Sequence, residues 1–569
     1  MQVRIKILTL FFLVFFFILV YRLFFWQILR SKSLAQEARS QYETKKFVSA
    51  PRGNILASDG SLLVARGEAY LAFAEIPQIK KSPQEIANLL APFFVEEKDD
   101  RQSLLEEIDR ITGLLSRKET VWVPLKQKVS TDLKKNIEAL KIEGLGFERK
   151  EDRIYPEASA AAHLLGFVGK NKEGDDVGYF GLEGYYDLSL AGKPCYASQE
   201  NDLLGKPILT GQVKEISVIS GVNLLTFLDK TVQMVLDKRL LEGIQKYGAK
   251  AGTAIVMDPK TGSIIGMSSY PSYDPVKYSQ FSDELFKNPA ISSVFEPGSV
   301  FKVVVMASAL DAKVVEADTI CDICSGPLKV DKYFIETWDK KYNPDSTMLE
   351  VIVHSDNVGM AFVGQKMGSD LLYDYLDRFG IGKPTGIDLQ GEVSPSLRKK
   401  GNWNIVDLAT AGFGQGIALT PIQLIRAVGA IANKGIMVSP RVVDKLMGEN
   451  WEENIKPKSG QRVISEKAAN EITAMMVEAA RKGEAKWTAL RGFDVAGKTG
   501  TAQIPIAGHY DADKTMASFI GFAPSDKPKF VMLITLREPS TSPWASETAA
   551  PLWYAIAKDL FSYFGIGPK

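Results

Sequence analysis

The sequence is poor in cysteine and has no excess of charge of either sign. Its three cysteines, Cys195, Cys321 and Cys324, are too few for a disulfide framework, and a single C-x-x-C pair without nearby histidines offers too few ligands for a structural zinc. We therefore expect ordinary loop cysteines, and the sequence leaves the redox state of Cys321 and Cys324 open. The 69 basic and 68 acidic side chains leave a formal net charge of +1, so there is no basic excess to neutralise phosphates. Nucleic acid is accordingly not an expected partner.

Histidine is also scarce, and this bears on catalysis. Only His163, His354 and His509 occur, and the sequence has no G-x-S-x-G nucleophile elbow. These absences argue against a serine, histidine and aspartate triad on an α/β-hydrolase fold. His354 directly precedes Ser355 and cannot easily turn back onto it, so we expect a structural role for this histidine.

The composition is that of a folded protein with a membrane anchor. Hydrophobic residues make up 45% and charged residues 24% of the 569, enough chain for more than one core. Residues 7–29 read ILTLFFLVFFFILVYRLFFWQIL, which is about the span of a bilayer, and Arg22 can snorkel to the interface. The run ends in large residues rather than in a small-residue cleavage site. An uncleaved anchor is therefore favoured over a cleaved signal peptide.

The first part of the remaining chain mixes short strands with helices. Apolar residues at three- and four-residue spacing predict helices over residues 82–94 and 99–115. Residues 186–221 are rich in glycine, serine and aspartate and are expected to form extended pieces and loops. A further helix is predicted from residue 228 to Gly248, where a domain boundary follows.

The second half begins and ends with strands. A hairpin is indicated by GTAIVMD and SIIGMSS on either side of the turn residues 259–262. Three more strands and a closing helix are expected over residues 493–504, 517–524, 529–536 and 546–565. With helices over residues 299–312 and 421–432 between them, five strands predict an antiparallel sheet with helices packed on it, an α+β design.

The segment EPGSVFK, residues 296–302, carries the strongest chemical signal. Proline and glycine before the apolar run VVVMASAL place Ser299 near a helix start, where free backbone N–H groups favour a developing anion. Lys302 shares its helix face and can activate it if desolvation or a nearby cation lowers the lysine pKa. Ser396 and Lys399 fit the same pattern, but they lie in a polar stretch with no apolar helix behind it, and we discard them.

Two further motifs strengthen this interpretation. HSDN occupies residues 354–357, and KTGT occupies residues 498–501 at the end of a strand-like run. The order S-x-x-K, S-D-N, K-T-G is that of the penicillin-recognising serine acyltransferases. The competing interpretation, in which Ser355 merely caps a helix and Lys498 is a solvated strand end, does not account for three motifs in this order.

On these motifs the chain resembles a class B penicillin-binding protein, a monofunctional peptidoglycan D,D-transpeptidase, and most of all the division-specific septal type. The resemblance runs from the anchor to about Phe564. Other segments that carry it are RGNI at 52–55, R-x-Y-P at 153–156, G-x-x-G-x-E at 178–183, YPSYDP at 270–275 and GFGQG at 412–416. Val300 departs from the family, which often has Thr after the nucleophile.

The resemblance implies the domain organisation and the location. The expected parts are a cytoplasmic stub at residues 1–6, a transmembrane signal anchor at 7–29, an extended mixed α/β pedestal of the class B dimerisation type at 30–227, a connecting helix at 228–250 and the transpeptidase domain at 251–569. Since the substrate is assembled outside the bacterial cytoplasmic (inner) membrane, a single-pass protein with an extracytoplasmic catalytic domain is expected. The basic residues that flank the anchor do not settle this orientation.

The resemblance also implies roles for individual residues. Ser299 would attack the carbonyl between the last two D-alanines of a stem peptide and release D-alanine, with Lys302 taking its proton. Ser355 would pass a proton to the leaving amine, with electrostatic support from Lys498. The oxyanion would be held by the backbone N–H groups of Ser299 and Thr501.

Substrate binding is assigned to the second and third motifs. Asn357 would hold the stem-peptide backbone through its side-chain amide. The hydroxyls of Thr499 and Thr501 would bind the terminal carboxylate, while Gly500 would leave room for the substrate along the strand. Neither a cofactor nor a metal is implied.

Several other functions compete with that of a class B transpeptidase. A D,D-carboxypeptidase or β-lactamase would hand the acyl group to water, but a β-lactamase needs an extra base for deacylation and has no evident use for the large N-terminal region. A non-catalytic β-lactam-binding membrane scaffold is weakened by the complete catalytic set and by the shortness of residues 1–6. A bifunctional synthase has little support, because EDRIY at residues 151–155 resembles the E-D-x-x-F motif of a glycosyltransferase domain only weakly.

The resemblance finally implies partners. They are peptidoglycan stem peptides, as D-Ala-D-Ala donor and amine acceptor, the cytoplasmic membrane, a SEDS-type glycan polymerase with other division proteins, and β-lactam antibiotics. The septal type is preferred on the contexts of residues 412–416 and 500–503, with the elongation type as the alternative.

Overall fold

A computed structural model describes residues 1–48, 50–95, 100–117, 120–156, 160–200, 218–457, 460–506 and 509–568. The chain forms two compact units. One consists of Met1–Arg52 with Ala191–Gly221, and the other consists of Gly53–Leu190 with Val222–Lys569.

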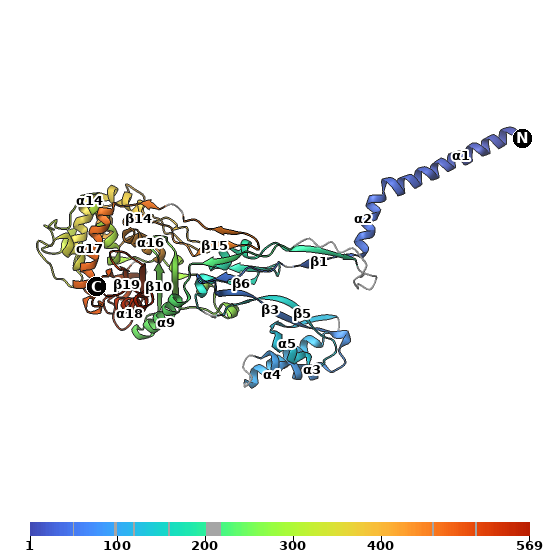
Figure 1. The fold of residues 1–569 in the computed structure, drawn as a ribbon, viewed down its shortest axis with the longest axis horizontal. Coiled ribbons are helices and arrows are strands. Elements are labelled where there is room, and N and C mark those ends of the chain that lie inside the picture. The colour runs from blue at the N-terminus through green and yellow to red at the C-terminus, as the bar shows by residue number, and fades with distance from the viewer. Residues whose placement is uncertain are drawn as a thin grey trace. The chain divides into compact units, whose positions relative to one another are not determined.

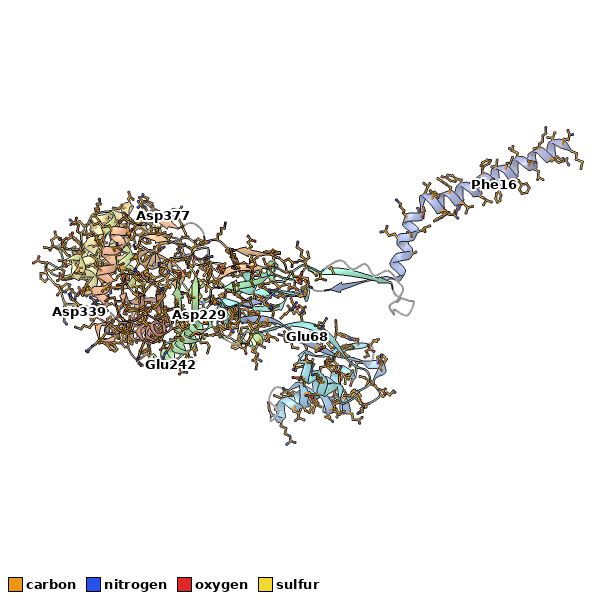
Figure 2. All side chains as sticks on the ribbon, in the orientation of Figure 1. Phe16, Glu68, Asp229, Glu242, Asp339 and Asp377 are labelled. Carbon is orange, nitrogen blue, oxygen red and sulfur yellow. A yellow bond between two sulfur atoms is a disulfide. The ribbon has the colours of Figure 1, made fainter. Side chains whose placement is uncertain are left out.

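The first unit contains the predicted apolar helix. α1 (Gln2–Phe24) continues into the π-helical turn η1 (Phe25–Leu29), and its side chains are exposed on every side, as Phe16 illustrates in Figure 2. Within the described residues, this is the one helix long and apolar enough to cross a membrane. The predicted N-terminal apolar helix is thus confirmed, and a helix that is apolar all round is suited to a single-pass membrane anchor. The unit also holds α2 (Ser31–Tyr42) and the antiparallel pair β1 (Glu43–Val48) and β8 (Cys195–Glu200).

A seven-stranded sheet organises the N-terminal part of the second unit. Its long strand β3 (Leu62–Glu75) pairs with β4 (Trp122–Val129) and β5 (Leu145–Ile154). Three helices pack beside these strands around a core of their own: α3 (Pro83–Phe94), α4 (Arg101–Leu115) and α5 (Thr131–Glu138). Ser82 and Asp100 cap α3 and α4, which are the two helices that the periodicity predicts.

The same sheet also takes in two strands from the second half of the chain. β9 (Asn223–Thr226) lies between β2 (Ile55–Leu56) and β15 (Val443–Met447), and β16 (Glu452–Asn454) completes that edge. The pedestal and the transpeptidase part therefore share backbone hydrogen bonds. Residues 186–221, expected as loops and extended pieces, also contain a short helix, α8 (Asp187–Leu190), and residues 201–217 lie outside the described residues.

The predicted five-stranded antiparallel sheet is present in the second half, in the order β11-β10-β20-β19-β18. Its strands are β10 (Ala251–Met257), β11 (Ile264–Tyr270), β18 (Ala496–Ile506), β19 (His509–Ala523) and β20 (Phe530–Arg537). The outcome confirms that strands from both ends of this part close one sheet, and with it the α+β design.

Helices cover both faces of this sheet (Figure 1). α9 (Lys230–Tyr247) and α18 (Ala549–Tyr563) form a core with one set of alternating strand residues. α12 (Lys302–Asp311) and α16 (Pro421–Ala432) form the larger core with the other set. Every residue of α16 is buried, so this apolar helix is the centre of the domain. The three motifs lie where the 3₁₀ turn that precedes α12 meets β18.

Candidate active site

The first motif lies in a tight turn at the start of α12. Ser299 is part of the 3₁₀ turn η4 (Gly298–Phe301), and the α-helix begins only at Lys302. Gly298 has φ +57° and donates its N–H to the carbonyl of Gly414 at 3.0 Å. A Cβ on Gly414 would lie 2.2 Å from the carbonyl oxygen of Gly298. The GFGQG segment therefore supports the turn that presents Ser299, which is itself half-buried.

Lys302 is completely buried and points into the site. Its Nζ donates to the carbonyl of Ser355 at 2.5 Å and to Oδ1 of Asn357 at 2.8 Å, and it lies 3.4 Å from Oγ of Ser355. Burial, and secondly the charge of Lys498, lower the pKa of Lys302 to about 7. A neutral amine is therefore accessible near neutral pH, which a general base requires.

The second motif occupies the sharp turn between α13 (Met348–Val353) and α14 (Asn357–Arg378). Ser355 has φ +58° and is 3% exposed. Asp356, rather than Ser355, caps α14, because its Oδ1 accepts the N–H groups of Val358 at 2.7 Å and of Gly359 at 3.1 Å. The interpretation of Ser355 as a simple helix cap is thus wrong, and its hydroxyl faces the two lysines instead.

The third motif brings a second buried lysine. Lys498 on β18 is 3% exposed, so it is not a solvated strand end, and its Nζ donates to Oγ of Ser355 at 2.9 Å. Burial lowers the pKa of Lys498, while Glu484 opposes this shift. The hydroxyl of Thr499 donates to Oε2 of Glu484 at 3.2 Å. The hydroxyl oxygen of Thr501 accepts the N–H of Ala545 at 3.0 Å.

Gly500 is required for the close packing of β18 against the Ser299 turn. A Cβ at this position would lie 2.8 Å from the backbone nitrogen of Val300 and 3.2 Å from the carbonyl oxygen of Pro297. The space beside Gly500 is therefore filled by the Ser299 turn, and Val300 is fully buried there. The glycine lets β18 approach the nucleophile closely.

Two exposed tryptophans next to the site were missed by sequence reasoning. The rings of Trp338 and Trp544 meet edge to face with centroids 5.3 Å apart. Trp338 follows Glu336, whose carbonyl accepts the Nδ2 group of Asn357 at 3.0 Å. Trp544 precedes Ala545, the partner of Thr501. No local pattern marks these tryptophans, because only the fold brings their two loops together.

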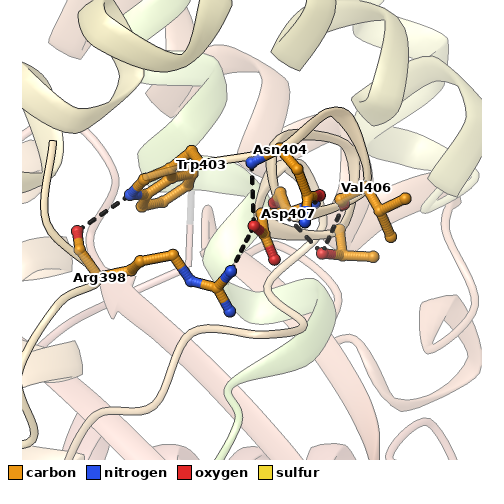
Figure 3. A network of polar contacts seen from close by, with 6 residues as sticks. Arg398, Trp403, Asn404, Val406 and Asp407 are labelled. Carbon is orange, nitrogen blue, oxygen red and sulfur yellow. Dashed lines mark hydrogen bonds and ion pairs between the residues drawn. The ribbon is translucent and has the colours of Figure 1, made fainter. Parts of the chain in front are cut away.

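The discarded S-x-x-K pattern lies elsewhere, in an irregular exposed segment (Figure 3). There Arg398 pairs with Asp407 at 2.5 Å, and its carbonyl accepts the indole N–H of Trp403 at 3.0 Å. These contacts tie the segment to the start of α15 (Ile405–Gly412). Ser396 and Lys399 do not share a helix face, which the S-x-x-K chemistry needs.

The structure answers the question that the sequence leaves open for one pair of cysteines. Cys321 and Cys324 form a disulfide, whereas Cys195 is a buried free thiol. Residues 321–324 fold into a turn that brings the two Cα atoms to 5.5 Å, within the range of disulfides. Among the described residues, no group of three or more His, Cys, Asp or Glu side chains could hold a metal ion.

Comparison with known proteins decides the family. The penicillin binding protein transpeptidase domain matches residues 252–561, and the penicillin-binding protein dimerisation domain matches residues 47–226. The chain belongs to the penicillin-binding proteins. It is 30% identical to stage V sporulation protein D of Bacillus subtilis, over all of this chain and 86% of that protein. It is 27% identical to a probable peptidoglycan D,D-transpeptidase of Neisseria meningitidis, over 97% of this chain and 91% of that one.

A solved structure agrees with this assignment. Penicillin binding protein 2X from Streptococcus thermophilus matches with a TM-score of 0.74 and 25% identity, over 91% of this chain and 80% of that chain. The predicted class B penicillin-binding protein, with its dimerisation and transpeptidase domains, is thereby confirmed.

Proposed function

We propose that this penicillin-binding protein cross-links peptidoglycan stem peptides through an acyl-enzyme on Ser299, with release of D-alanine. The observation that carries the proposal is the meeting of two buried lysines at one serine. Lys302 and Lys498 both reach Oγ of Ser355, at 3.4 Å and 2.9 Å, directly behind the Ser299 turn. Such an arrangement can both remove and return a proton within one site.

Acylation follows from the roles of these groups. Neutral Lys302 takes the proton of Ser299 as Oγ bonds to the carbonyl carbon of the penultimate D-alanine. The backbone N–H groups of Ser299 and Thr501 hold the oxyanion, and one such donor is worth roughly 3 kcal/mol of barrier. The carbon–nitrogen bond then breaks, and Ser355 passes a proton to the nitrogen of the leaving D-alanine and regains one from the lysine pair. An amine of a neighbouring stem peptide then attacks the ester carbonyl, the carbon–oxygen bond to Ser299 breaks, and the proton that the amine loses is returned to Oγ of Ser299 by Lys302.

Substrate binding falls on groups that keep spare hydrogen-bonding capacity. Thr501 accepts the N–H of Ala545, which leaves its proton for the terminal carboxylate. Asn357 uses Oδ1 for Lys302 and one N–H for the carbonyl of Glu336, so its second N–H serves the stem-peptide backbone.

The location and partners complete the proposal. The anchor helix holds the protein in the cytoplasmic membrane, and the residues after about Leu29 lie outside it, where a SEDS-type polymerase and other division proteins work with it. Protease added to intact spheroplasts is expected to digest most of the chain, and its protection would contradict this topology. The septal role is tested by depletion: blocked septation with normal elongation is expected, whereas rounding of rods would indicate the elongation type.

The chemical test uses the full chain in detergent micelles. Intact mass after exposure to a penicillin is expected to show one stable adduct in the wild type and in Ser396→Ala, and none in Ser299→Ala. An adduct that decays within minutes would indicate a hydrolase. An adduct that persists in Ser299→Ala would refute the assigned nucleophile.

A further inference from the structure

Glu484 lies outside all three motifs, yet its side chain reaches the site. Its Oε2 accepts the hydroxyl of Thr499 at 3.2 Å, and Oγ1 of Thr499 accepts Nζ of Lys498 at 3.3 Å. Lys498 also donates to Oγ of Ser355 at 2.9 Å. A continuous chain of polar contacts therefore runs from Glu484 to the serine that is proposed to protonate the leaving group.

The main chain fixes the place of Glu484. Helix α17 (Glu466–Lys482) ends at Gly483, where a Cβ would lie 2.9 Å from the carbonyl oxygen of Val353, the last residue of α13. On the other side, Ala485 is only 4% exposed. Glu484 is thus held between two tightly packed neighbours, beside the turn that follows α13. The packing of the main chain on both sides therefore places the side chain of Glu484 beside Thr499.

The negative charge of Glu484 acts on the two buried lysines of the site. Lys302 and Lys498 share a buried site, and the acids that face them are Asp356 at the start of α14 and Glu484 at the end of α17. Asp356, and after it Glu484, favour the charged form of Lys302, while Glu484 is the acid that opposes the lowering of the Lys498 pKa. Two adjacent ammonium groups repel each other, so the arrangement favours one proton on the pair.

We propose that Glu484 is a positioning residue that keeps this proton on Lys498 and turns the Thr499 hydroxyl away from the substrate carboxylate. The inference rests on the proposed function, in which Lys302 must be neutral to activate Ser299 while Lys498 stays charged. It assigns carboxylate recognition mainly to Thr501, because the hydroxyl proton of Thr499 is already donated to Glu484.

The test is the pH profile of acylation, measured with the full chain in detergent micelles and a fluorescent penicillin. Glu484→Gln keeps an acceptor for Thr499 but removes the charge. The acylation rate is expected to fall at high pH, where Lys498 loses its proton. In Glu484→Gln this alkaline limb is expected at least about one pH unit below that of the wild type, because a nearby opposite charge shifts a pKa by about 1–3 units. The matched control is Glu478→Gln on α17, the helix that precedes Glu484. Glu478 pairs with Arg481 and Lys482, and the alkaline limb of this variant is expected to stay in place.

Further variants separate positioning from folding. Glu484→Asp keeps the charge and is expected to retain the alkaline limb while acylating more slowly. Thr499→Val and Glu484→Gln are expected to combine with less than additive loss, because both break the same contact. A Glu484→Gln profile that superimposes on the wild type, or that falls equally at every pH, overturns the inference.

The same assay distinguishes a failure of the proposed function from a failure of the role of Glu484. If the penicillin does not label the wild type, or if it labels Ser299→Ala, the proposed function itself is wrong. Normal labelling of the wild type, its loss in Ser299→Ala and an unshifted Glu484→Gln profile defeat only the role of Glu484.

Discussion

The side-chain nitrogen of Lys498 lies 2.9 Å from the hydroxyl oxygen of Ser355, although 143 residues separate them. The two residues come from β18 and from the turn before α14, and β18 also packs against the turn that carries Ser299. This contact links the second and third motifs into one proton path. Its consequence can be measured without the natural substrate.

The first prediction concerns Ser355 itself. Ser355→Ala removes the hydroxyl between the two lysines and is expected to slow acylation by a penicillin roughly 100- to 10,000-fold, the usual range for a lost general acid or base. Stopped-flow labelling measures the rate constant. Ser308→Ala is a control for burial, since Ser308 is also fully buried but only donates to the carbonyl of Val304. Near-normal acylation by Ser355→Ala would remove Ser355 from the path.

The second prediction is the acid limb of the same reaction. A protonated amine cannot accept a proton, so with the pKa of Lys302 at about 7 the rate is expected to rise with pH and to be half-maximal near that value. Asp356 favours the charged lysine, so Asp356→Asn is expected to move this limb to lower pH while the asparagine still caps α14. An acid limb that stays put or moves upward in this variant would contradict the assignment of Lys302 as the base.

The motifs predict which side chains make up the candidate site, but they do not predict the residues around it that hold these side chains in place. Ser299, Lys302, Ser355 and Lys498 could be named from the sequence because the order of three motifs is distinctive. Glu484 and the pair Trp338 and Trp544 could not, because their contacts depend on how distant loops meet. The close packing of Gly500 against Val300 and Pro297 was likewise not predictable, since it depends on the neighbouring turn rather than on the strand itself.

The fold could be predicted where the local sequence pattern is strong, but not where segments far apart in the sequence pair. Strong local signals identify the hairpin of β10 and β11, the helix α16 and the capped helices of the pedestal. Pairing between distant strands leaves no local signal, so β15 joining β9 in the pedestal sheet was not foreseen. The redox state of Cys321 and Cys324 could not be decided from the sequence, because a C-x-x-C pair closes only when its turn brings the two Cα atoms together.

The third prediction tests that disulfide. Without reductant, the protein unfolded in denaturant is expected to take up a thiol-alkylating reagent once, at Cys195, because Cys321 and Cys324 are joined. After reduction, all three cysteines are expected to react. Intact mass measures both states, and Cys195→Ser is the control that should show no uptake before reduction. Three alkyl groups on the unreduced wild type would show that the pair is not bonded.

The fourth prediction concerns a buried ion pair that joins two of the pedestal motifs. Nε and Nη2 of Arg153 donate to Oε1 of Glu183 at 2.8 Å and 2.6 Å, and the two side chains are 6% and 0% exposed. Glu183→Gln leaves the arginine charge buried without its counterion and is expected to cost about 3–5 kcal/mol of stability. The midpoint of urea unfolding, followed by tryptophan fluorescence, measures this loss.

Two further variants decide whether the loss comes from charge or from shape. Glu143→Gln breaks the exposed ion pair with Lys80 and is expected to leave the midpoint almost unchanged, because exposed pairs are screened by water. Arg153→Met combined with Glu183→Leu removes both buried charges and is expected to recover most of the stability, since the penalty lies in the unpaired ion. If this double variant is as unstable as Glu183→Gln, the two residues contribute through packing or other contacts rather than through their mutual charge.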